Sequence, residues 1–253
     1  MRPSPLPQLA VALLCAALGS CRSSYWKPPL EREAWSMYEP GNVGVGLRPG
    51  LFALYGIDGE FVAETPAKGT LEQSDSGDFV ARFGAAARAE LVLRDDLLIA
   101  LGIDYRLYDI DGLNPIQELD ISVDEVDSLQ YYLALRYLLP AFESQPRLRP
   151  FAQATVAYLP SVDIGFEIDL SNFGSSNLRI DTEGEGYWVG GASVGLLYQW
   201  TDHLVAELGL LYEVPITELD ADLSFSIGPS EVPMFAELKP QGLLGFGGLT
   251  WYF

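Results

Sequence analysis

The chain has 253 residues, of which 49% are hydrophobic and 12% aromatic, and its formal net charge is −20. A chain this acidic is ordinarily poor in hydrophobic residues and disordered, so the composition excludes extended disorder. The charge balance also argues against nucleic-acid binding, because a protein that neutralises phosphates needs a surplus of Lys and Arg. Here 15 basic residues stand against 35 acidic ones, and we expect no nucleic-acid partner.

Residues 1–20 are predicted to be a signal peptide. Residues 9–18 are all apolar, which suits a signal-peptide core and is about half of what a membrane-spanning helix requires. The sequence Leu18-Gly19-Ser20-Cys21 resembles the lipobox of bacterial lipoproteins, in which the cysteine is acylated and begins the mature protein. Ordinary signal-peptidase cleavage near the same small residues is the alternative. Because Cys15 lies within the signal peptide, the mature body offers no disulfide or thiolate metal site.

Residues 21–42 are predicted to form a lipidated N-terminus and a proline-containing periplasmic tether, followed by a single domain over residues 43–253. In this domain eight segments show period-two alternation of apolar and polar residues, which predicts transmembrane strands rather than helices. The segments are 43–57, 78–94, 97–109, 126–139, 149–162, 186–200, 204–216 and 241–253.

The two faces of these segments differ in kind. In the third segment Leu97, Ile99 and Leu101 lie on one face, and Asp104 and Arg106 on the other. A soluble barrel would alternate as well. However, the apolar face is too continuous for a soluble surface, and the charges on the other face are separated by Gly, Ala and Ser, which suits a narrow polar interior.

The connections between the segments alternate between short and long, as in outer-membrane barrels. Short connections fall at 95–96, 140–147 and 201–203. The sequence therefore predicts an all-β fold: an eight-stranded antiparallel up-and-down transmembrane β-barrel with short periplasmic turns and long acidic extracellular loops. The four expected loops hold 24 acidic residues and three basic ones, and they are residues 58–78, 109–127, 163–185 and 217–239.

Aromatic residues mark the expected membrane boundaries and the end of the domain. Trp188 and Trp200 lie twelve residues apart on one face, a separation of about 28 Å along the membrane normal for a tilted strand, which fits two interface girdles. Gly248, Trp251 and Phe253 resemble the C-terminal assembly signal of outer-membrane β-barrel proteins, although Phe246 stands where that pattern has a polar residue.

By this pattern, residues 43–253 resemble the small eight-stranded bacterial outer-membrane barrels of the OmpA, OmpX and OmpW type. The resemblance implies a location in the bacterial outer membrane, with outer-membrane lipid and the barrel assembly machinery as partners. An eight-stranded barrel has an interior just wide enough for side chains, so we expect a plugged lumen and a structural or surface-interaction role.

Nine charged residues are predicted to face the lumen. Unpaired charges in a low-dielectric tube are costly, so we expect them to form an ion-pair network. They are Arg48, Arg82, Arg88, Glu90, Asp104, Arg106, Arg136, Glu207 and Glu213.

An enzyme, a transporter and a soluble ligand-binding barrel are the alternatives to the structural role. Outer-membrane barrel enzymes, as families, use a His near the outer rim as a proton shuttle. The single His, His203, falls in a short turn, so we predict no enzyme and no cofactor. Lumen-side Phe52, Leu98, Leu197 and Leu211 suggest an OmpW-like transporter or channel for small or hydrophobic solutes as the alternative. A soluble lipocalin-like ligand-binding barrel is a further alternative.

One segment resembles a calcium-binding loop in part. Asp109, Asp111, Gly112 and Glu118 match its positions three, five, six and twelve, but position one falls on Leu107, which cannot ligate a metal. We therefore predict no such site. The acidic loops remain candidates for diffuse binding of divalent cations, with a merely solvated acidic rim as the alternative.

Overall fold

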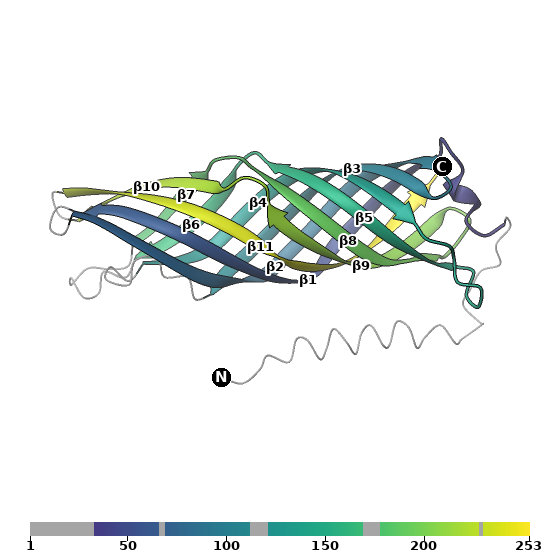
Figure 1. The fold of residues 1–253 in the computed structure, drawn as a ribbon, viewed down its shortest axis with the longest axis horizontal. Helices are drawn as coiled ribbons and strands as arrows, with labels where there is room; N and C mark the ends of the chain where they lie inside the picture. Colours follow the sequence, from purple (N-terminus) through teal and green to yellow (C-terminus); the bar gives the residue numbers. More distant parts are fainter. Residues whose placement is uncertain (1–32, 66–68, 112–120, 169–177, 228–229) are drawn as a thin grey trace, which may run out of the picture.

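The computed structural model describes residues 33–65, 69–111, 121–168, 178–227 and 230–253. This part of the chain consists of a 3-10 turn, η3 (Ser36–Tyr38), and antiparallel strands (Figure 1). No helix among these residues is both long and apolar enough to cross a bilayer. The strands are β1 (Val43–Thr65), β2 (Gly69–Arg94), β3 (Leu97–Asp111), β4 (Ile121–Leu138), β5 (Leu148–Leu159), β6 (Val162–Ile168), β7 (Leu178–Gly184), β8 (Tyr187–Gln199), β9 (Leu204–Pro215), β10 (Leu219–Ile227) and β11 (Ser230–Tyr252).

Eight of these strands form a closed ring. Going around it, β1, β2, β3, β4, β5, β8, β9 and β11 each pair with the next, and β11 pairs with β1. The predicted all-β barrel is therefore confirmed. The turns at 95–96, 139–147 and 200–203 lie at one end, together with the C-terminus (Figure 1). We call this the short-turn end and the opposite end the long-hairpin end.

In the half nearer the short-turn end, the outside of the barrel is apolar. Outward-facing Leu47, Leu101, Leu133 and Leu249 are all exposed, as are most of the large apolar side chains that alternate with them. The inward-facing residues of the same strands include buried Arg, Glu, Gln and Ser side chains. A continuous exposed apolar surface of this kind is what a bilayer covers in a transmembrane barrel.

In the half nearer the long-hairpin end, the alternation is reversed. Ile57, Phe61 and Ala63 of β1 are buried inside, whereas the intervening Asp58 and Glu60 are exposed. The same strand can make this change because its pairing with β11 shifts register between Gly50 and Phe52, which moves the outward positions from odd to even numbers. A bulge of this kind re-aims every side chain that follows it.

Where the structure describes them, the four predicted long loops are consequently wrong as loops, because most of their residues lie in strands. Residues 58–65 and 69–78 continue the β1–β2 hairpin. The described ends of the expected loop 109–127 belong to β3 and β4, and β6, β7, β10 and the start of β11 fill much of the other two. β1, β2 and β11 have 23, 26 and 23 residues, roughly twice what crossing a bilayer requires. The acidic residues of these segments alternate with buried apolar ones, so the strands continue where their outward faces become charged.

The three additional strands extend the barrel wall at the long-hairpin end. β4 pairs with β6 beyond the point where its pairing with β5 ends, β6 pairs with β7, and β10 pairs with β11. Among the described residues, β7 and β10 are joined by a backbone hydrogen bond from Glu185 N to Asp220 O (2.8 Å) instead of a ladder.

Part of the predicted tether also belongs to the folded body. In residues 33–42, Met37 and Tyr38 are buried, and Gly41 N donates a hydrogen bond to Val92 O at 2.8 Å. The prolines and the lack of alternation predict a tether, but the aromatic side chains of residues 33–42 pack into the short-turn end.

Close backbone approach inside the barrel gives a first prediction. A Cβ at Gly195 would lie 2.4 Å from Leu208 O and 2.6 Å from the Phe151 ring. Gly195→Val should therefore destabilise the barrel by about 1–3 kcal/mol or prevent its assembly. Val194→Leu, on the exposed apolar face next to it, should change stability by less than about 0.5 kcal/mol. Urea unfolding in lipid vesicles, followed by heat-modifiable gel migration, measures both; equal stabilities would contradict the packing.

Candidate functional site

A closed ring of four charges lies in the lumen near the short-turn end. Arg88 Nε is 2.7 Å from Glu90 Oε1, and Arg88 Nη1 pairs with Glu207. Arg136 lies across the lumen from Arg88, with Nη1 3.3 Å from Glu90 Oε1 and Nη2 3.0 Å from Glu207 Oε2. Each guanidinium thus contacts both carboxylates, all four side chains are buried, and the ring as a whole is neutral.

Neutral polar side chains complete the shell of this ring. Arg88 Nη2 donates a hydrogen bond to Thr250 Oγ1 at 2.9 Å, and Arg136 Nε donates one to Gln153 Oε1 at 2.9 Å. Buried ion pairs repay their desolvation only when the remaining donors and acceptors are also engaged.

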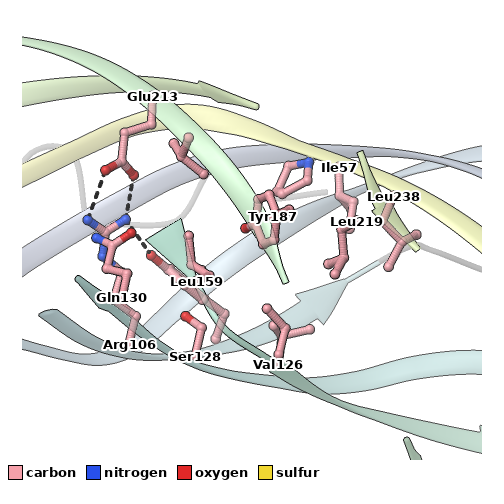
Figure 2. A pocket seen from close by; sticks show the side chains of 14 residues that line it. Ile57, Arg106, Val126, Ser128, Gln130, Leu159, Tyr187, Glu213, Leu219 and Leu238 are labelled. Carbon is pink, nitrogen blue, oxygen red and sulfur yellow. Dashed lines mark hydrogen bonds and ion pairs between the residues drawn. The ribbon is translucent and has the colours of Figure 1, made fainter. Parts of the chain in front are cut away.

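A second charged cluster lies deeper, towards the long-hairpin end. Arg106 contacts Asp104 (Nη2–Oδ2, 2.7 Å) and forms a two-pronged pair with Glu213 (2.5 and 3.0 Å). Gln130 Nε2 donates to Asp104 Oδ2 at 3.1 Å. Figure 2 shows the Arg106–Glu213 pair with Gln130 beside it. Arg–carboxylate pairs with two parallel bonds are among the strongest that side chains make.

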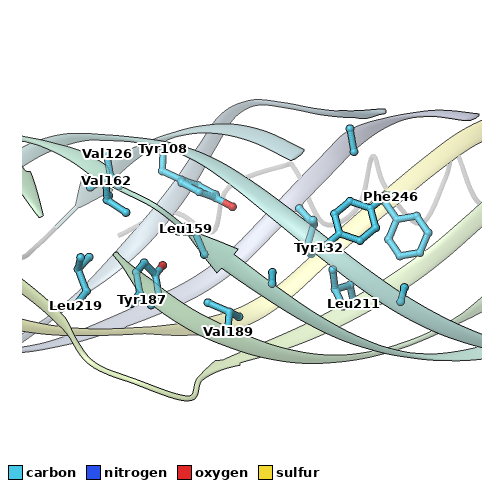
Figure 3. Close-up of a cluster of buried hydrophobic side chains, with 14 of the residues drawn as sticks. Tyr108, Val126, Tyr132, Leu159, Val162, Tyr187, Val189, Leu211, Leu219 and Phe246 are labelled. Atoms are coloured by element: carbon cyan, nitrogen blue, oxygen red, sulfur yellow. The ribbon is translucent and has the colours of Figure 1, made fainter. Parts of the chain in front are cut away.

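Aromatic rings hold two of the guanidinium groups. The Cζ of Arg48 lies 4.4 Å from the Phe246 ring centre and 5.5 Å from that of Tyr132, and Arg136 Cζ lies 4.3 Å from Phe151. Figure 3 shows Tyr132 and Phe246 next to each other in the interior. Cation–π contacts gain strength when desolvated. The sequence does not predict these contacts, although Phe246 is notable in it as an aromatic residue where the assembly signal has a polar one.

Eight of the nine residues expected in the network are buried in the lumen, and seven of them join the two carboxylate clusters. Four buried guanidiniums stand against four buried carboxylates, so the described charges of the lumen balance. Arg48 contacts rings rather than joining either carboxylate cluster. The side chain of Arg82 lies outside the described part of the structure, as does that of Phe52.

The residues expected at the membrane boundaries are at opposite ends of β8. Trp188 and Trp200 are both half-exposed, at 46% and 47%, and Trp188 packs on Tyr158 with ring centres 4.9 Å apart. His203 lies at the short-turn end and stacks on the exposed Trp251 (5.8 Å). Among the described residues, no hydrogen bond or ion pair joins the His203 side chain to the lumen charges.

The other residues of the expected assembly signal have separate surroundings. A Cβ at Gly248 would lie 2.7 Å from Leu47 O and 3.0 Å from a Glu207 oxygen, so this position needs glycine beside the charge ring. Phe253 is exposed, and its backbone N donates to Val43 O at 2.9 Å.

The partial calcium motif is not a loop at its start. Asp109 and Asp111 are the last residues of β3, where they pair with Glu125 and Asp78. Glu118 lies outside the described residues. Within the described part of the chain, no group of three or more His, Cys, Asp or Glu side chains is arranged to hold a metal ion.

A small cavity lies between the deeper charge cluster and the long-hairpin end. Its volume is about 40 Å³, room for on the order of three water molecules. Arg106 and Glu213 lie at one side of it, and Ile57, Leu219 and Leu238 lie at the other (Figure 2). Beyond the cavity the interior is filled by buried apolar side chains of β1, β6, β10 and β11.

The long-hairpin end carries acidic side chains in close proximity. Asp220 of β10 lies directly opposite Glu237 of β11, and Lys239 bridges Glu237 (2.7 Å) and Glu218 (3.0 Å). Partial burial raises the pKa of Asp220 above its ordinary value, and the neighbouring carboxylates, first that of Glu237 and then that of Glu185, raise it further. The hydrogen bond from Lys239 lowers the pKa of Glu237.

A ring of antiparallel strands with an apolar exterior and a filled, charged interior defines a small transmembrane-type β-barrel. No protein-family model and no curated protein matches the chain. Among solved structures, OprG, an outer membrane protein from Pseudomonas aeruginosa, matches with TM-score 0.50 and 14% identity, over 85% of this chain and 98% of that one. The outer membrane protein AlkL matches with TM-score 0.49 and 17% identity, over 92% and 96%. The likeness to OprG shows the fold, that of a bacterial outer-membrane β-barrel.

The charge ring predicts a large cost for removing one cation. Arg88→Ala leaves Glu90 and Glu207 buried with Arg136 alone, which should cost about 3–5 kcal/mol. Arg94→Ala removes the exposed Arg94–Asp96 pair (2.8 Å) at the short-turn end and should leave the stability close to that of the parent, because solvent screens an exposed pair. Urea unfolding in vesicles compares the two. Similar losses in both variants would show that the lumen pairs do not stabilise the barrel.

The raised pKa of Asp220 predicts a pH-dependent effect. Because its folded-state pKa lies above that of an unfolded chain, ionisation of Asp220 penalises the folded state at neutral pH, and acidification relieves the penalty. Asp220→Asn should therefore slow amide exchange in β10 about two- to fivefold near pH 7, with the difference fading towards about pH 4.

Glu64→Gln is the matched control, since the exposed Glu64 at the same end lies opposite the uncharged Thr70. A slower exchange for Asp220→Asn that persists undiminished at acid pH would contradict the electrostatic cause.

Proposed function

We propose that this protein is a lumen-closed barrel of the bacterial outer membrane with a structural or surface-interaction role. The observation that carries the proposal is the filling of the interior. Four groups follow one another along the lumen: the charge ring, the Tyr132 and Phe246 rings around Arg48, the Arg106 cluster, and the apolar residues of the long-hairpin half. The exposed apolar surface around the short-turn half supports insertion in lipid.

The proposed orientation has the short-turn end in the periplasm and the long-hairpin end outside the cell. Outer-membrane barrels generally have short periplasmic turns and longer external segments. Acylation of Cys21 in the inner leaflet agrees with this orientation, because the chain enters the barrel at the short-turn end. Recognition of Gly248, Trp251 and Phe253 by the barrel assembly machinery is part of the same proposal.

The surface role rests on the long-hairpin half. Its outward positions carry acidic side chains on a rigid scaffold of paired strands, with an apolar core behind them. Such a surface repels anions and attracts divalent cations or basic partners, with a strength that falls as salt is added. A catalytic role receives no support from the position of His203, which lies at the other end of the molecule.

Transport of small apolar solutes is the second candidate, and the cavity beside Leu219 and Leu238 is the observation that favours it. Leu98, Leu197 and Leu211 also face the interior, where they are buried. Entry of a solute would require the surrounding side chains to move, because the cavity is only about 40 Å³.

Flux measurements on the reconstituted barrel test the two functions. The structural role predicts no steady ion conductance in planar bilayers and no accelerated uptake of a hydrophobic fluorescent probe into vesicles. Uptake of the probe without ion conductance would favour the transporter. Steady ion conductance of the parent protein would overturn the closed lumen. Heat-modifiable migration and partition into detergent confirm in the same samples that the barrel is folded and membrane-compatible.

A further inference from the structure

The segment before β1 lies in the opening of the barrel at the short-turn end. Trp35 N donates to Gln199 Oε1 at 2.9 Å, and Trp35 Nε1 donates to Pro146 O at 2.6 Å, which ties the segment to β8 and to the turn before β5. On the opposite wall, Gly41 N donates to Val92 O at 2.8 Å, and Val92 N donates to Asn42 O at 3.0 Å. Residues 35–42 therefore cross the opening and are bonded on both sides.

The side chains of this segment fill the opening. Met37 and Tyr38 are buried, and the Trp35 and Tyr38 rings are stacked with centres 5.6 Å apart. Arg149 lies near both rings, at 6.0 and 5.9 Å. Trp35 has φ of 68°, a left-handed conformation that costs a bulky residue of order 1 kcal/mol or more and persists only where the surroundings hold it.

A chain of hydroxyl groups connects the segment to the charge ring. Tyr38 packs edge-on against Tyr252, with ring centres 5.0 Å apart, and the two hydroxyl oxygens are 3.3 Å apart. Tyr252 in turn donates to Glu90, which is paired with Arg88 and Arg136. Since a carboxylate can only accept, Tyr252 donates to Glu90 and accepts from Tyr38.

We propose that residues 33–42 form a removable plug that closes the short-turn opening, with Tyr38 as a latch that joins the plug through Tyr252 to the Glu90 charge ring. Displacement of the plug removes a hydrogen bond from Tyr252 and exposes Glu90 to water. Trp35 lies 14 residues after the lipobox cysteine Cys21 in the sequence.

Access of a thiol reagent to the opening tests the plug. Leu98 faces inward at 1% exposure, on β3 opposite Val92, the residue bonded to the plug. Leu98→Cys, in a full chain with Cys15 and Cys21 replaced by Ser, is treated with a charged methanethiosulfonate reagent in detergent micelles. Heat-modifiable migration confirms folding of each variant.

The plug predicts slow labelling of Cys at position 98 in the parent and at least tenfold faster labelling when Trp35→Ala and Tyr38→Ala are combined. Ser36→Ala is the matched control, because the Ser36 hydroxyl makes no hydrogen bond to a described residue, and its rate should equal that of the parent. A double variant within twofold of the parent overturns the plug.

The latch has its own variant. Tyr38→Phe keeps the ring and removes only the hydroxyl, and it should speed labelling about fivefold, the effect of one ordinary hydrogen bond. A rate equal to that of Ser36→Ala overturns the latch. Should the double variant fail to fold, amide exchange in the parent decides: the amides of Tyr38 and Gly41 should be protected, and exchange at the rate of an unfolded peptide overturns the plug.

This inference rests on the proposed closure of the lumen but can fail separately from it. Labelling at position 98 reports only on the opening, whereas conductance reports on the whole lumen. Fast labelling of the parent without conductance leaves the closed lumen intact and removes the plug.

Discussion

A guanidinium group buried inside an eight-stranded barrel must find a partner, because an unpaired buried charge is costly. This constraint governs the short-turn half of the barrel and the Arg106 cluster beyond it. Arg88 on β2 and Arg106 on β3 both reach carboxylates of β9, on the far side of the lumen. Arg136 on β4 reaches Glu90 on β2. The pairs therefore tie strands that are distant in the sequence and not adjacent in the ring.

The same pairs fix the register of the strands. Shifting one strand by a single residue would turn its inward charges to the lipid and its leucines to the lumen. Such a shift would leave the opposing charges buried and unpaired, at a cost of several kcal/mol each. Small residues make room for the bulky pairs. Gly248 lies beside Glu207, and Gly195 leaves space for the Phe151 ring, which makes a cation–π contact with Arg136. The ion pairs, the aromatic rings and the glycines of the lumen are thus parts of one packing arrangement.

Sequence patterns predicted the membrane-facing half well, because its outward side chains are apolar and its inward side chains are mostly polar or charged. The apolar outward face and the charged inward face both left a period-two signal, and the inward charges could be named from it. The long-hairpin half was misread as loops, because its apolar residues point inward and its outward acids resemble loop composition. The bulge after Gly50 also breaks the phase of the pattern.

The aromatic partners of Arg48 and the packing of Tyr38 left no comparable signal. Cation–π contacts such as Arg48 over Phe246 depend on residues from opposite walls, and no local pattern links them. The segment before β1 lacks alternation altogether, and its role depends on Gln199 and Tyr252, more than 160 positions later in the chain. Spacing rules cannot detect contacts of this kind.

The reversed alternation in the long hairpins separates two sets of positions with different freedom to vary. Inward residues such as Ile57 and Phe61 maintain the core of the long-hairpin half, whereas outward residues such as Asp58 and Glu60 are exposed. Substitutions at such exposed positions should disturb the fold far less than substitutions in the core. The chemistry of this surface can therefore change residue by residue, while the strands that present it remain the same.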